Sequence, residues 1–123
     1  MNSPMDDAAS APVFDPDSMM ARFENDTELA KMVIEGFLED IPNKFITIKA
    51  CLENADGKQA TILIHSVKGA AANISGERLR ITAFKTEKKA TLGDWPAVTA
   101  DMPELEKQYA ILADELKCYL TKI

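Results

Sequence analysis

The chain has 123 residues, of which 46% are hydrophobic, 28% charged and 7% aromatic, a length and balance that predict one domain with its own core and exclude intrinsic disorder. Its 14 Lys+Arg and 20 Asp+Glu give a formal net charge of −6, which disfavours nucleic acid and anionic membranes as main partners because both attract basic surfaces. Because no apolar run approaches the roughly 18 residues of a membrane span, and the acidic N-terminus lacks a signal-peptide pattern, we expect a cytoplasmic protein without membrane insertion.

The N-terminal part predicts a flexible segment followed by a short helix. Residues 1–13 mix Pro, Ser, Ala and Asp without periodicity and are expected to be a flexible lead-in to a single domain over residues 14–123. Asp15 can cap the short helix, with Pro16 in its first turn and an end near Phe23.

Two longer helices are predicted next. An apolar stripe at helical spacing begins after Asp26-Thr27, and we expect Pro42 to end or kink this helix because proline lacks a backbone donor and clashes one turn back. The stripe continues to about Asn54. The following helix is predicted from Lys58 to about Asn73, and its buried face consists of Leu63, Val67, Ala70 and Ile74.

The last two helices are predicted over Glu77 to about Leu92 and over a C-terminal segment with Pro103 in its first turn. The pattern leaves open a further helical stretch from Trp95 to Met102, joined to the last helix through a kink. No alternating β-branched run is flanked by hairpin residues. Helices joined by short polar loops pack as antiparallel neighbours, so the expected fold class is all-α, an antiparallel up-and-down four-helix bundle with a short extra N-terminal helix.

His65, the one histidine of the chain, is predicted to face solvent. Helical geometry places it about 160° around the helix from Leu63 and Val67, and Lys68 and Gly69 follow about one turn later on its own face. A mid-helix glycine costs roughly 1 kcal/mol relative to alanine, a cost that is understandable if a partner must reach the imidazole. The same face includes Thr61 and Ala72, with Ile62 and Lys58 at its margin.

The sequence around this histidine resembles the signature of histidine-containing phosphotransfer domains of two-component phosphorelays: it reads His65-Ser66-Val67-Lys68-Gly69-Ala70-Ala71-Ala72-Asn73. The resemblance extends from about Phe14 to Leu120. It implies that His65 accepts a phosphoryl group on Nε2 from a receiver-domain aspartate and passes it to another receiver aspartate. Lys68 would stabilise the phosphoryl charge and Gly69 would give access. The resemblance assigns docking to Thr61, Ile62, Ala72 and Lys58.

The same resemblance implies the partners. These are response-regulator receiver domains and a hybrid sensor histidine kinase, with Mg²⁺ supplied by the receiver, no cofactor or metal in this chain, and a monomeric state. Residues 57–90 carry seven basic and two acidic side chains, a net charge of +5, which favours the approach of an acidic partner.

The helix after the signature departs from the family pattern. Thr82 and Thr86 stand where larger apolar residues are usual, and Ile81 and Phe84 fall off the expected apolar stripe. Two interpretations remain open: either this helix is rotated, or Ile81 and Phe84 border the docking face.

Other chemistries lack the residues that they need. One histidine without a glycine-framed serine gives no support for a hydrolase triad, and the absence of a Walker loop or GxGxxG motif excludes autonomous kinase activity. Cys51 and Cys118 lack metal-ligand or redox spacing and are expected to be buried free thiols, with a disulfide between them as the alternative. The rival function is a helical module that docks a receiver or kinase without being phosphorylated. Loss of the histidine, lysine or glycine would favour it, and all three are present.

Overall fold

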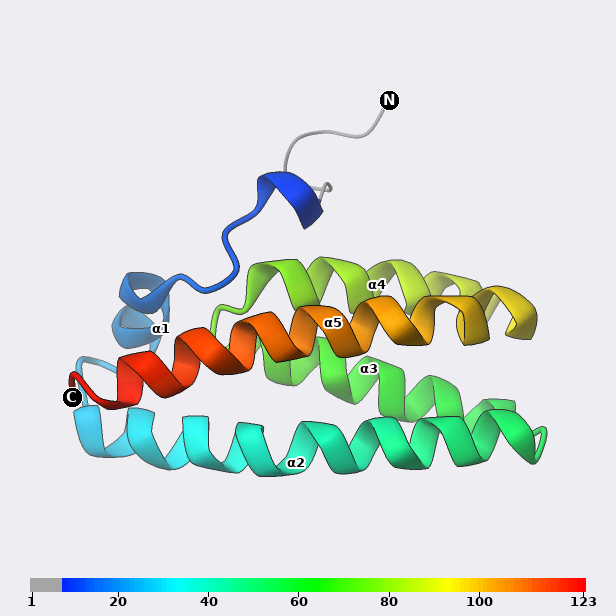
Figure 1. Cartoon of the computed structure of the whole chain (residues 1–123), viewed down its shortest axis with the longest axis horizontal. Coiled ribbons are helices and arrows are strands. Elements are labelled where there is room, and N and C mark those ends of the chain that lie inside the picture. Colours follow the sequence, from blue (N-terminus) through cyan, green and yellow to red (C-terminus); the bar gives the residue numbers. More distant parts are fainter. Residues whose placement is uncertain (1–7) are drawn as a thin grey trace.

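The computed structural model describes residues 8–123, and every regular element in this range is helical. Four long helices lie side by side with alternating direction, and a shorter helix lies at one end of the bundle (Figure 1). The elements are a 3-10 helix Ala8–Ser10, α1 (Pro16–Arg22), α2 (Thr27–Glu53), α3 (Gly57–Asn73), α4 (Glu77–Thr91) and α5 (Trp95–Leu120). Around the bundle, α3 lies between α2 and α4, and α5 closes the ring. The predicted all-α bundle is therefore confirmed.

Aspartate side chains begin four of the five α-helices. Each accepts a hydrogen bond at 3.1–3.2 Å from a backbone N–H three residues later, and the four residues are Asp15, Asp26, Asp56 and Asp94. Such caps satisfy a backbone donor that has no partner within the helix, and they place negative charge at the positive end of the helix dipole. The caps therefore fix where α1, α2, α3 and α5 begin.

Two prolines lie inside helices without ending them. α2 runs through Pro42 and α5 runs through Pro103 as single helices. The prediction that Pro42 ends its helix is therefore wrong, and the helical stretch that begins at Trp95 is continuous with the last helix. A proline removes one backbone hydrogen bond, but Ile41 beside Pro42 and Leu105 near Pro103 are at most 1% exposed. Burial of such large apolar side chains offsets the loss.

The core lies between the four long helices. α3 buries a face that consists of Ala60, Ile64, Val67 and Ala71. The sequence placed Leu63 and Ala70 on this face, but both are only partly buried, so α3 is turned by about one residue from the predicted orientation. Because the chain is apolar at both 63 and 64, the packing of the neighbouring helices decides which side chain enters the core.

The two threonines of α4 are buried with paired hydroxyls. Thr82 donates to the backbone one turn earlier at 2.8 Å, and the Thr86 hydroxyl lies 2.9 Å from a carboxylate oxygen of Asp101 on α5. Ile81 is 3% exposed, whereas Phe84 is 38% exposed. The buried face of α4 is therefore wider than the predicted stripe, and of the two off-stripe apolar residues only Phe84 borders the surface.

Residues 8–13 contact the bundle, whereas residues 1–7 of the predicted lead-in lie outside the described residues. Arg78 on α4 donates from Nε to the carbonyl oxygen of Ala11 at 2.6 Å. Phe14 packs edge-on against Tyr119 of α5, with ring centroids 5.5 Å apart. These contacts hold the chain that precedes α1 against α4 and α5.

The two cysteines are free thiols, which rules out the disulfide alternative. Cys51 is buried as expected, but the prediction of burial is wrong for Cys118, which lies on the solvent side of the last turns of α5. Within residues 8–123, no helix is long and apolar enough to cross a membrane.

Candidate functional site

His65 lies in the middle of α3 on its solvent side, and 65% of its side chain is exposed. The other residues that the sequence assigned to the site share the outer part of the same helix. Lys58, Ile62 and Gly69 are exposed, and Thr61, Lys68 and Ala72 are half-buried. α3 therefore brings all seven onto one surface around the imidazole.

Glu87 on α4 is the site residue that sequence reasoning missed. One of its carboxylate oxygens lies 2.5 Å from Nδ1 of His65, and the other accepts a hydrogen bond from Nζ of Lys68 at 2.7 Å. The Glu87 side chain is only 16% exposed. Its one signal in the sequence is that it is one of two acidic residues within the basic segment 57–90, which by itself does not place it beside a residue 22 positions earlier.

The carboxylate of Glu87 determines which ring nitrogen of His65 carries the proton. Burial acts to raise the pKa of Glu87, but hydrogen bonds from Lys68 and His65 and their positive charge outweigh burial, so that the net pKa lies below its ordinary value. An ionised carboxylate only accepts hydrogen bonds, and Nδ1 must therefore donate to it. In the neutral imidazole this leaves the lone pair on Nε2. The site thus presents Nε2 as a nucleophile on an exposed helix face.

Lys68 lies between a carboxylate and an aromatic ring. Besides its ion pair with Glu87, its Nζ lies 5.3 Å from the centroid of the Phe84 ring, and Nζ of Lys88 lies 4.2 Å from the same centroid. Both distances are within the range of cation–π attraction. Two lysines and a partly exposed phenylalanine therefore border the histidine on its α4 side.

Gly69 has open space where a side chain would be. A Cβ atom placed there meets no heavy atom within 4 Å, so close helix packing does not explain the glycine. Gly76 differs, because a Cβ there would lie 2.6 Å from a methyl carbon of Leu112. The absence of a side chain at position 69 leaves the surface beside His65 free for a partner.

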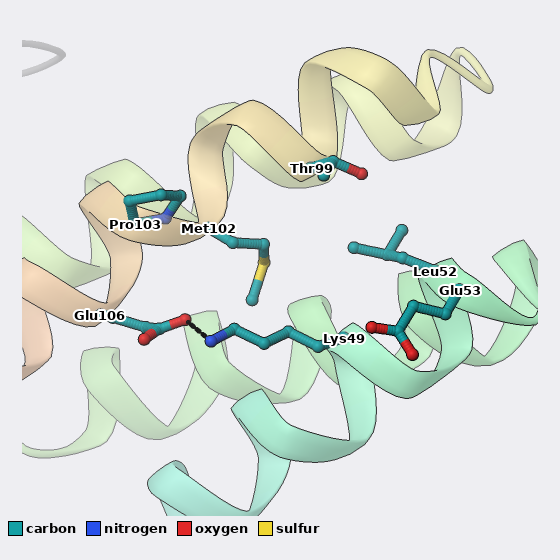
Figure 2. A pocket seen from close by; sticks show the side chains of 7 residues that line it. All are labelled: Lys49, Leu52, Glu53, Thr99, Met102, Pro103 and Glu106. Carbon is teal, nitrogen blue, oxygen red and sulfur yellow. Dashed lines mark ion pairs between the residues drawn. The ribbon is translucent and has the colours of Figure 1, made fainter.

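The largest described hollow lies away from His65. It is a groove of about 450 Å³ between α2 and α5, and Figure 2 shows Lys49 and Glu106 joined across it by an ion pair of 2.5 Å. No residue predicted for the site lines this groove. Within residues 8–123, no group of three or more His, Cys, Asp or Glu side chains could hold a metal ion. The reactive side chains are therefore gathered on an open surface.

Two solved structures share this fold. Histidine-containing phosphotransfer protein B from Pseudomonas aeruginosa PAO1 matches with a TM-score of 0.84 and 20% sequence identity, covering 92% of this chain and 98% of that one. The HPT domain of a sensor hybrid histidine kinase from Shewanella matches with a TM-score of 0.75 and 16% identity, covering 90% and 96%. No protein-family model and no curated protein matches the sequence. The chain therefore has the helical-bundle fold of histidine-containing phosphotransfer proteins.

Proposed function

We propose that the chain is a histidine phosphotransfer module of a two-component phosphorelay and that His65 carries the phosphoryl group. The observation that carries this proposal is the exposed imidazole whose Nδ1 is bonded to an ionised carboxylate, which leaves Nε2 free to react. The sequence run around His65 and the fold shared with two phosphotransfer proteins support the same assignment.

The reaction is an exchange of one bond to phosphorus for another. The lone pair of Nε2 attacks the phosphorus atom of an aspartyl phosphate on a receiver domain. A P–N bond forms, the P–O bond to the aspartate breaks, and its electron pair leaves with the carboxylate oxygen. Onward transfer to a second receiver aspartate reverses these roles. Such transfers depend mainly on alignment and on stabilisation of the spread negative charge.

The surroundings of His65 fit this division of labour between two proteins. Lys68 supplies positive charge beside the imidazole, and the basic character of residues 57–90 suits an acidic receiver surface. The receiver would bring its own Mg²⁺ and acidic pocket, so that this chain contributes the nucleophile and its positioning. A hybrid sensor histidine kinase would supply the phosphoryl group through its receiver domain, and the module would act as a monomer in the cytoplasm.

The proposal is tested by mixing the protein with a phosphorylated receiver domain and measuring the intact mass of each partner. The wild type is expected to gain one acid-labile phosphoryl group, and His65→Gln is expected to gain none while keeping its helical circular dichroism spectrum. Phosphorylation of His65→Gln would overturn the assignment. Binding of several receivers without any transfer would instead favour the rival docking module.

A further inference from the structure

Glu87 has a consequence for the phosphorylated state that goes beyond orienting the free imidazole. Its two carboxylate oxygens contact the ring nitrogen Nδ1 of His65 and the ammonium group of Lys68. A phosphoryl group on Nε2 leaves the Nδ1 side of the ring in contact with Glu87. The carboxylate therefore remains next to Nδ1 after phosphoryl transfer, and this argument rests on the function proposed above.

The proton on Nδ1 controls how readily the phosphoryl group leaves. When Nδ1 keeps its proton, the phosphorylated ring is a cation, and cleavage of the P–N bond returns the electron pair to Nε2 and releases a neutral imidazole. When Nδ1 has lost its proton, the same cleavage must release an imidazolide anion, which is a much poorer leaving group. A side chain that retains this proton therefore shortens the lifetime of the phosphohistidine.

A carboxylate in contact with Nδ1 retains the proton for two reasons. It attracts the cationic ring, and it would repel the lone pair that deprotonation exposes on Nδ1. An opposite charge within about 4–6 Å favours the charged form of a titrating group by about tenfold or more. The other charged groups near the ring are Lys68 on α3 and Lys88 on α4, and both disfavour the cationic ring. Glu87 is thus the group that opposes them.

We propose that Glu87 is a positioning residue that shortens the lifetime of phosphorylated His65 by keeping the Nδ1 proton on the ring. The module then releases its phosphoryl group readily to an acceptor, an aspartate oxygen or water, and does not store it. A neutral amide at position 87 would accept the same hydrogen bond without supplying the charge.

The lifetime can be measured without a receiver. Wild type, Glu87→Gln and Glu77→Gln are phosphorylated with potassium phosphoramidate, freed of reagent, and followed by ³¹P NMR at a slightly alkaline pH. Glu77→Gln is the matched control because it removes one acidic charge from α4 at a residue that pairs with Arg80. We expect the phosphohistidine of Glu87→Gln to last about tenfold longer than that of the wild type, and Glu77→Gln to match the wild type.

A second readout excludes a merely structural effect. The ¹⁵N spectrum of the phosphorylated ring should show a protonated Nδ1 in the wild type under conditions where Glu87→Gln has lost that proton. Equal lifetimes in the wild type and Glu87→Gln would overturn the inference. Failure of Glu87→Gln to accept phosphate would also overturn it, because Glu87 would then be needed to form the P–N bond. Neither outcome affects the proposed function, which fails only if a phosphorylated receiver does not label wild-type His65.

Discussion

Replacement of Gly69 by alanine should stabilise the protein. A Cβ atom at this position meets no heavy atom within 4 Å, so the substitution introduces no clash. Glycine in a helix interior costs roughly 0.8–1.0 kcal/mol relative to alanine. We therefore expect Gly69→Ala to raise the free energy of unfolding by about 0.8 kcal/mol, which corresponds to an increase in Tm of about 3–5 °C for a domain of this size.

The assay is urea and thermal unfolding followed by circular dichroism. Gly36→Ala on α2 is the matched control, because Gly36 is also in a helix interior and a Cβ atom added there would likewise meet open space, and it should be stabilised by a similar amount. A destabilised Gly69→Ala beside a stabilised Gly36→Ala would refute the conclusion that the space at Gly69 is open.

The same position separates stability from function. Gly69→Trp keeps the open backbone environment but fills the surface beside His65. We expect its phosphoryl transfer from a receiver to fall by about 100-fold, the cost of misplacing reacting atoms by about 1 Å, while its helical content is unchanged. Transfer at the wild-type rate would show that the glycine does not serve access.

Three further predictions concern residues that support the site. The lowered pKa of Glu87 means that its ionised form stabilises the fold at neutral pH and that this contribution is lost as pH falls; the stability advantage of the wild type over Glu87→Gln should therefore shrink between about pH 6 and about pH 3, and a constant difference would contradict the pairing. Thr86→Val removes a buried hydroxyl from Asp101, which keeps its ion pair with Lys89 at 2.8 Å, and should cost about 1 kcal/mol in urea unfolding; an unchanged midpoint would argue against the bond. Gly57→Ala would drive a Cβ atom into the Trp95 ring and should cost about 1–3 kcal/mol in the same assay, whereas a stabilised variant would show that the ring moves freely.

The parts of the fold that follow from local sequence were predictable. Asp15 and Asp26 mark helix starts because a cap acts on backbone only three residues away. Helical geometry placed His65 on the solvent side of α3 even though the predicted buried face was displaced by one residue, because an imidazole far from either version of that face still points outward. Local patterns therefore predicted the exposed histidine and the glycine beside it.

The parts that depend on packing between helices were not predictable. Glu87 reaches His65 from α4, and the rotation of α4 follows from buried threonines whose hydroxyls are satisfied by the backbone and by Asp101. Pro42 was misjudged for the same reason, since burial of its neighbours, which only the tertiary structure provides, allows α2 to continue. The second half of the site thus required the three-dimensional arrangement.

The central claim is that the phosphoryl group is carried on Nε2 of His65. The most direct measurement is ³¹P and ¹⁵N NMR of the ring-labelled protein after phosphorylation by a receiver domain. The account predicts a phosphorus signal coupled to Nε2 of His65, with a proton on Nδ1 facing Glu87. A phosphoryl group on Nδ1, or on any residue other than His65, would contradict it.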